Sequence, residues 1–257
     1  YVHLKNVNVS IPIYDSHALR LIRLPAFRDA RVGTDTASRS HGVIVIHALK
    51  NLNMEVEEGD RVCLIGPNGA GKTTFFSTLV GLIRPDSGSI QLDGTSVVGQ
   101  KPHKVAALGM TKTFQNVALF AESSVLDNVL TAGLLRHDVE TARKEALICL
   151  DRVGLKSVAH KLAGNLSFPE RARVELARAL CTGPKVLLLD EVTSALDTVV
   201  GAAILDLLAQ LRKELGVSYM FISPDMNTVR AMCVEIVVLY AGQKGESLTR
   251  SAFAPPP

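Results

Sequence analysis

The sequence contains no tryptophan, and aromatic residues make up only 5% of its 257 residues. This scarcity disfavours a surface that stacks nucleic-acid bases. The net charge is only +3, which is too small for binding nucleic acid through overall charge. No apolar run approaches the roughly 18 residues of a membrane-spanning helix. The composition therefore disfavours a protein that binds nucleic acid through stacking or overall charge, and it predicts no membrane-spanning helix.

The four cysteines are spaced too widely for a metal site. None lies at zinc-ligand spacing from another, and each has apolar neighbours: Cys63, Cys149, Cys181 and Cys233. We interpret them as small buried hydrophobic residues in a reducing compartment. The seven histidines contain no H-x-x-x-H pair, so no histidine metal site is predicted.

Strand and helix patterns alternate along a chain that is 47% hydrophobic and 21% charged. Strands are expected at residues 2–11, 43–49, 52–56, 61–65, 89–94, 185–191, 219–222 and 236–240. Helices are expected between residues 123 and 162 and at residues 173–180 and 202–215. Residues 18–24 predict either a short basic amphipathic helix or a solvated insertion, and residues 245–257 predict a frayed tail. The length fits one large α/β domain or two small ones.

The most informative segment is a glycine-rich loop between the strand expected at residues 61–65 and a helix expected at residues 74–80. It fits the phosphate-binding pattern G-x-x-x-x-G-K-[ST] and consists of Gly66, Pro67, Asn68, Gly69, Ala70, Gly71, Lys72 and Thr73. The glycines let successive N–H groups point at a polyphosphate, and the positive end of the next helix faces the same anion. Lys72 is expected to reach the β- and γ-phosphates, and Thr73 to ligate Mg²⁺. A plain glycine-rich turn is the alternative, which the flanking strand and helix disfavour.

A second candidate motif ends the strand expected at residues 185–191. Asp190 follows four apolar residues, as does an aspartate that holds Mg²⁺ through water. Glu191 comes directly after it and is suited to orient or deprotonate the water that attacks a γ-phosphate. Two solvated acids at a strand end are the alternative. Together with the upstream loop, the pair predicts Mg²⁺-dependent hydrolysis of a nucleotide.

With both motifs in place, nearly the whole chain resembles the nucleotide-binding subunits of ABC transporters. Three further segments carry the resemblance: Thr113-Phe114-Gln115-Asn116 resembles the Q-loop, Ser194-Ala195-Leu196-Asp197 resembles the D-loop, and Leu166-Ser167-Phe168-Pro169-Glu170 stands where the L-S-G-G-Q signature belongs. The resemblance implies that Gln115 senses Mg²⁺ and the attacking water, and that Asp197 crosses a dimer interface. It also implies that Ser167 binds phosphate.

The fold that the resemblance implies is α/β, a P-loop NTPase core of ABC type with an antiparallel β subdomain and an inserted helical subdomain. The expected division is a core with its β subdomain at residues 1–116 and 166–245, the helical subdomain at 117–165 and a tail at 246–257. The implied partners are a second ABC ATPase subunit, identical or different, and an integral membrane permease that residues 117–165 contact; nucleic acid is not among them. The implied location is the cytoplasmic face of the cell membrane.

The resemblance also implies a set of site residues. Glu191, Gln115 and Lys72 are the implied catalytic residues. The implied ATP site consists of the loop from Gly66 to Thr73 together with Thr74, Ser167 and Asp197. The implied Mg²⁺ ligands are Thr73, Gln115 and Asp190. ATP and Mg²⁺ are the implied cofactors.

Three departures from the family pattern bear on hydrolysis. Phe168 and Pro169 stand where the signature has two glycines whose N–H groups close on the partner's γ-phosphate, and proline has no N–H. Pro224 stands where the family usually has a histidine that helps to hold the γ-phosphate and the water. Val234 follows a cysteine where relatives often have an acid, and His47 is the nearest ring available for adenine. The alternative function is therefore an ATP-binding dimerisation switch with weak hydrolysis.

Different parts of the chain resemble different transport systems. Residues 1–83 resemble exporters of polysaccharide or teichoic acid, residues 84–190 resemble branched-chain amino acid importers, and residues 191–257 resemble oligopeptide importers. This mosaic suggests a recombined or designed chain. A third function, an ABC protein that acts on DNA or ribosomes, is disfavoured because the chain has neither paired domains nor long coiled-coil inserts.

Overall fold

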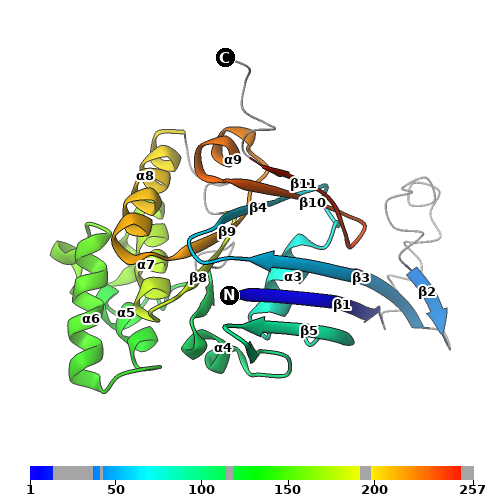
Figure 1. Cartoon of the computed structure of the whole chain (residues 1–257). Helices are drawn as coiled ribbons and strands as arrows, with labels where there is room; N and C mark the ends of the chain where they lie inside the picture. The colour runs from blue at the N-terminus through cyan, green and yellow to red at the C-terminus, as the bar shows by residue number, and fades with distance from the viewer. Residues whose placement is uncertain (14–36, 41–42, 114–117, 192–197, 250–257) are drawn as a thin grey trace, which may run out of the picture.

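The computed structural model describes residues 1–13, 37–40, 43–113, 118–191 and 198–249. Within these residues, an antiparallel sheet and a mostly parallel sheet lie next to each other, and a group of helices covers the far side of the parallel sheet (Figure 1). The predicted α/β class, with an antiparallel sheet and additional helical segments, is confirmed.

The antiparallel sheet has the strand order β2-β3-β1-β5-β6. Its strands are β1 (Val2–Ile13), β2 (Ala37–Ser40), β3 (Val43–Val56), β5 (Ser87–Leu92) and β6 (Thr95–Ser96). Val2, Leu4 and Val7 of β1 are buried, whereas His3 and Lys5 are exposed, so one face packs on the core and the other meets solvent. The two strands expected at 43–49 and 52–56 form one strand, β3, and the pairing of β1 with β3 is irregular along this stretch.

The second sheet has the strand order β11-β10-β4-β9-β8-β7. Its strands are β4 (Arg61–Ile65), β7 (Met110–Lys112), β8 (Val186–Asp190), β9 (Ser218–Ile222), β10 (Glu235–Tyr240) and β11 (Gln243–Thr249). The five strands from β10 to β7 are parallel, and β11 is antiparallel to β10. Every residue of β8 and β9 is buried, as expected for strands covered on both faces.

Helices connect the strands of the described part of the chain. They are α3 (Lys72–Leu79), α4 (Pro102–Leu108), α5 (Val125–Gly133), α6 (Val139–Arg152), α7 (Phe168–Cys181), α8 (Thr198–Leu215) and α9 (Met226–Met232), with 3₁₀ turns η2 (Lys156–Val158) and η3 (Ala163–Asn165). Helices α5, α6 and α7 pack on one another at one end of the molecule (Figure 1). No helix in the described part of the chain has the length and apolar character needed to cross a membrane.

Two apolar cores lie on opposite faces of the parallel sheet. Val186 and Leu188 of β8 belong to the core that contains Phe75 and Phe76 of α3. Leu187 and Leu189 belong to the other core, which contains residues of α5 to α8. Because side chains alternate along a strand, the even-numbered residues of β8 lie on the sheet face that carries α3.

Three expectations about element boundaries are wrong. The helix expected at residues 202–215 begins at Thr198. The helix expected at residues 173–180 begins at Phe168, because Ser167 and Glu170 form a capping box and Pro169 sits in the first turn, where a proline is tolerated. The frayed tail expected from residue 245 is also wrong for residues 245–249, which belong to β11 and pair with β10.

Candidate functional site

The loops that follow the parallel strands lie at one edge of the sheet. Because β7, β8, β9, β4 and β10 run in the same direction, their carboxyl ends share that edge, which is where open α/β sheets bind ligands. The phosphate loop (residues 66–73) follows β4, Asp190 ends β8 with Glu191 directly after it, and Pro224 follows β9. Residues that are far apart in the sequence are therefore gathered at one edge.

Two glycines of the phosphate loop lie against neighbouring backbone. Gly71 has φ +98°, and a side-chain carbon added there would lie 2.5 Å from the carbonyl oxygen of Ala48. A carbon added at Gly66 would lie 2.1 Å from the carbonyl oxygen of Leu239. Any larger residue would have to displace backbone at either position, so the loop depends on glycine there.

The middle of the phosphate loop is open to solvent. Pro67, Asn68 and Gly69 are exposed, whereas Ala70 is buried. The N–H of Ala70 donates to the carbonyl oxygen of Pro67 at 3.1 Å, and the N–H of Gly242, in the turn after β10, donates to that of Ala70 at 3.1 Å. These bonds fix the base of the loop and leave its tip accessible to an anion.

The first turn of α3 carries the side chains expected to meet the phosphates. The ammonium of Lys72 donates to the carbonyl oxygens of Gly66 at 2.8 Å and Pro67 at 3.0 Å, so it lies over the loop. Thr73 is exposed, and Thr74 is half-buried. Half-buried Lys72 and exposed Thr73 thus lie at the edge where a nucleotide is expected.

Asp190 lies on the sheet face that carries α3. It is 1% exposed and follows Val186 and Leu188 at the spacing of two that keeps side chains on one face. Ile222 of β9 is in register with Asp190 on one side and with Leu64 of β4 on the other. Asp190 is therefore two strand spacings, about 9–10 Å, from the strand that leads into the phosphate loop.

A lysine that the sequence analysis missed faces the Asp190 carboxylate. Nζ of Lys112, the last residue of β7, lies 2.8 Å from Oδ2 of Asp190. The contact is an ion pair by distance but lacks hydrogen-bond geometry, and neither Asp190 oxygen accepts a hydrogen bond from any residue that the structure describes. Buried acceptors without donors are costly. No local pattern marks Lys112, because only the pairing of β7 with β8 brings it to Asp190.

Glu191 leaves the strand in a left-handed conformation. Its φ is +50°, which is uncommon for a residue other than glycine. Its N–H donates to the carbonyl oxygen of Ile222 at 2.9 Å, so β9 holds the residue at the sheet edge. Strained backbone of this kind is concentrated at functional sites, and Glu191 is the residue for which the sequence predicts action on the attacking water.

At the start of α7, the donors of Ser167 bind the carboxylate of Glu170 from the same helix. The carboxylate of Glu170 accepts hydrogen bonds from the hydroxyl of Ser167 at 2.7 Å and from the N–H of Ser167 at 2.8 Å. These two bonds, that of the hydroxyl first, hold the pKa of the Glu170 carboxyl below its usual value. Phe168 is 46% exposed, and Pro169 supplies no N–H. The part of the molecule that the structure describes shows no hydrogen bond from Ser167 to the phosphate loop.

The remaining predicted positions fall into two groups. Pro224 is exposed between β9 and α9, and Nδ1 of His47 lies 3.1 Å from the Ser10 hydroxyl, between β3 and β1. Gln115 and Asp197 lie outside the described residues, as does the segment 18–24. The structure therefore brings together the phosphate loop, Lys72, Thr73, Asp190 and Glu191, and their roles as site residues stay predictions.

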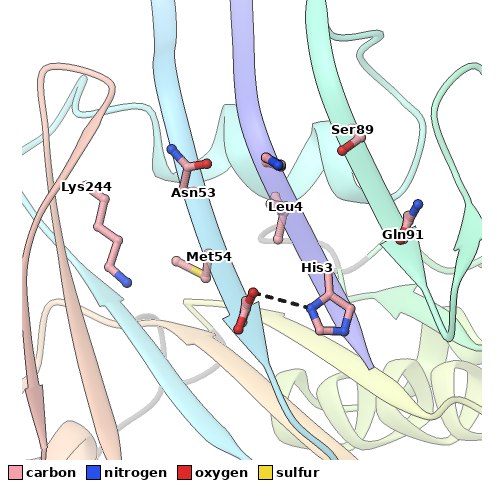
Figure 2. A pocket seen from close by; sticks show the side chains of 9 residues that line it. His3, Leu4, Asn53, Met54, Ser89, Gln91 and Lys244 are labelled. Atoms are coloured by element: carbon pink, nitrogen blue, oxygen red, sulfur yellow. Dashed lines mark ion pairs between the residues drawn. The ribbon is translucent and has the colours of Figure 1, made fainter.

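An open groove of about 720 Å³ lies on the solvent face of the antiparallel sheet. Nδ1 of His3 lies 3.7 Å from Oε1 of Glu55 in this groove. Figure 2 shows further polar side chains of the lining, among them Asn53, Gln91 and Lys244. None of the predicted site residues that the structure describes lines this groove. Its polar side chains are those expected on the wet face of an antiparallel sheet.

Known proteins resemble this chain over most of its length. The family described as ABC transporter matches residues 49–194. BraF from Pseudomonas aeruginosa, a high-affinity branched-chain amino acid transport ATP-binding protein, is 37% identical over 211 residues, which cover 76% of this chain and 83% of BraF. MetN from Thermobifida fusca, a methionine import ATP-binding protein, is 35% identical over 229 residues, which cover 82% of this chain and 70% of MetN.

Solved structures resemble the chain as well. The dimeric structure of the ATP-binding cassette MJ0796 in a post-hydrolysis state, bound to ADP and Pi, has a TM-score of 0.76 and 26% identity. The match covers 97% of this chain and 99% of that one. The resemblances of residues 1–83 to polysaccharide exporters and of residues 191–257 to oligopeptide importers stay predictions.

Proposed function

The chain belongs to the ABC transporter family as an ATP-binding subunit, and on this premise we propose that it hydrolyses ATP with Mg²⁺ at the carboxyl edge of its parallel sheet. It is an ABC-type ATPase that energises transport. The observation that carries the proposed site is the Asp190 carboxylate, which is buried on the face that carries α3 and accepts no hydrogen bond from the described residues.

The residues at this edge fit Mg²⁺. Magnesium binds oxygen ligands, usually through one or two carboxylates together with substrate phosphates. The two Asp190 oxygens without hydrogen bonds and the hydroxyl oxygen of Thr73, an exposed residue, are ligands of this kind. We assign Thr73 and Asp190 to the metal, with Gln115 as the third ligand that the family resemblance implies.

The chain's own residues divide the chemistry between them. Lys72 turns from the loop carbonyls to the β- and γ-phosphates and balances their charge. The loop N–H groups and the start of α3 orient the phosphates. Glu191 accepts the proton of the water that attacks the γ-phosphate in line. When bound, Mg²⁺ supplies positive charge against the β- and γ-phosphate oxygens.

We propose that two such subunits close on two ATP molecules. The structurally similar MJ0796 cassette has been solved as a dimer bound to ADP and Pi. Ser167 and the start of α7 are oriented for an anion, yet they have no described hydrogen bond to the chain's own phosphate loop. In such a dimer, Ser167 and Asp197 would contact the nucleotide that is bound to the phosphate loop of the second subunit, as the family pattern implies. The second subunit is identical or different.

The proposed membrane partner docks on the helical end of the molecule. Large apolar side chains are exposed there, among them Phe120 at 62% and Val139 at 60%. Such residues mark protein contact surfaces when they cluster. The similarity to BraF and MetN supports amino acids as the cargo class and import as the direction, with the chain at the cytoplasmic face of the membrane. Co-purification with a membrane subunit tests this assignment.

We expect ATP turnover by the full chain to require Mg²⁺. The proposed site stabilises the transferred phosphoryl group through charge, so chelation of Mg²⁺ with EDTA should lower the turnover number at least about a hundredfold. Phosphate release at saturating ATP, with Mg²⁺ and with EDTA, measures the effect. Turnover that persists in EDTA after exhaustive metal removal would contradict the proposed site.

The second candidate is a dimerisation switch that binds ATP and hydrolyses it slowly. The observation that favours it is the start of α7, where Pro169 supplies no N–H and Glu170 occupies the hydroxyl and N–H of Ser167. Fewer donors then remain for the partner's γ-phosphate. ATP affinity is similar in the two candidates, and the turnover number separates them.

If hydrolysis is weak, Pro224→His should raise the turnover number about tenfold or more, because a positioned imidazole can hold the γ-phosphate and the water. The measurement is steady-state phosphate release by the full chain. Pro102→His changes an exposed proline in the first turn of α4 and should leave turnover unchanged. A natural chain that already hydrolyses about one ATP per second or faster would argue against the switch.

A further inference from the structure

The Asp190 carboxylate already has a cation beside it. The Lys112 ammonium lies 2.8 Å from Oδ2, and the two side chains are 9% and 1% exposed. Other ion pairs of the chain are far more open; the pair of Lys185 with Asp93, for instance, is 49% and 39% exposed. Lys112 and Asp190 therefore form the kind of buried pair in which the loss of one partner leaves an uncompensated charge.

The strand pairing places Lys112 on the same sheet face as Asp190, the face where we propose that Mg²⁺ binds. Lys112 lies opposite Leu188 in the parallel pairing of β7 with β8, so the two side chains project from the same face. Met110, two residues before Lys112, belongs to the core that contains α3. Asp190 is two residues beyond Leu188 on that face. Backbone pairing thus fixes both ends of the ion pair on the side of the phosphate-loop helix.

The Lys112 ammonium neutralises the charge of the Asp190 carboxylate, but it does not supply the hydrogen bonds that the two carboxylate oxygens lack. Neither Asp190 oxygen accepts a hydrogen bond from the described residues, even though the ammonium is within ion-pair distance. The same two oxygens are the ones that a divalent cation would need. Two cations at one buried carboxylate repel each other, and at low dielectric that repulsion is strong.

We propose that Lys112 is a positioning residue that stands in for the metal at Asp190 in the nucleotide-free subunit and competes with Mg²⁺ when the nucleotide binds. This inference rests on the magnesium site proposed above. Lys112 keeps the buried carboxylate paired when no nucleotide is present. The cost of moving the ammonium away raises the Mg²⁺ concentration that tight nucleotide binding requires.

The test measures the Mg²⁺ concentration at half-maximal binding of a non-hydrolysable ATP analogue. Lys112→Met removes the charge at similar length, and we expect this midpoint to fall about tenfold. Thermal unfolding without nucleotide should show a lower Tm, and Mg²⁺ with the analogue should raise the Tm more than in the natural chain. Lys112→Gln keeps an N–H donor without the charge, and it should also lower the midpoint. It replaces Lys112→Met in the test if that variant does not fold.

Two control variants separate this role from a merely structural one. Lys112→Arg keeps the charge and should leave the midpoint within about twofold of the natural chain. Lys185→Met removes the exposed pair with Asp93 and should change neither the midpoint nor the stabilisation by Mg²⁺. A lower Tm with an unchanged midpoint in Lys112→Met and Lys112→Gln would overturn the inference. If binding by the natural chain does not depend on Mg²⁺ at all, the proposed metal site itself fails.

Discussion

Glu191→Gln is expected to lower the ATP turnover number at least about a hundredfold, because an amide cannot accept the proton of the attacking water. ATP affinity should stay within about threefold of that of the natural chain, since glutamine has the same shape and the phosphate loop is untouched. The N–H of Glu191 donates to the Ile222 carbonyl oxygen, and φ is +50°. Both features belong to the backbone, which the substitution retains.

Steady-state phosphate release and equilibrium ATP binding measure the two effects. The matched control is Glu235→Gln, which changes a half-buried glutamate at the amino end of β10 and should leave turnover unchanged. With hydrolysis blocked, Glu191→Gln with ATP should also elute as a dimer in size-exclusion chromatography. Turnover within about threefold of the natural chain would show that another group accepts the proton.

The parallel sheet and its phosphate loop could be predicted from sequence because their signals are local. The glycine spacing, the apolar run before Asp190 and the strand and helix around the loop are each contained in a short segment. Backbone geometry then follows from residue type: Gly71 can adopt φ +98° and lie against Ala48, as the pattern requires of a glycine. The burial of residues 186–189 of β8 likewise follows from their unbroken apolar run.

The features that were missed depend on contacts between distant segments or on weak patterns. Lys112 meets Asp190 only through the pairing of β7 with β8, and no property of its own neighbours indicates this. β11 has mostly exposed residues, so it lacks the apolar alternation that reveals a strand, and pairing with β10 holds it. The start of α7 could have been predicted from the sequence, because Ser167-Phe168-Pro169-Glu170 is an S-x-x-E capping sequence.

The roles of several site residues do not follow from the fold. The phosphate loop and Asp190 lie at one edge of a single chain, whereas Ser167 and Asp197 are expected to act on a nucleotide held by a second subunit. A single chain contains only half of such a site. The geometry of α7 adds a fact that the sequence alone did not supply, since Glu170 occupies the Ser167 donors.

Gly71→Ala is expected to weaken ATP binding about a hundredfold, which corresponds to about 2.8 kcal/mol. The added carbon would lie 2.5 Å from the Ala48 carbonyl oxygen and 3.2 Å from Cδ2 of Leu49. Backbone on one side and a buried leucine on the other leave it no room, so the loop must move. Lys72 and Thr73 follow Gly71 directly and would move with it, away from the phosphates that they are expected to contact.

The control separates this collision from backbone strain alone. Gly59 has φ +81°, yet a carbon added there meets nothing within 4 Å. Gly59→Ala should therefore cost about 1–3 kcal/mol of unfolding free energy through strain, with ATP affinity unchanged. Chemical denaturation and equilibrium ATP binding on both variants supply the comparison. If Gly71→Ala loses stability like Gly59→Ala but keeps its affinity within about threefold, the loop does not need the close approach to β3, and the nucleotide is held mainly by other parts of the edge.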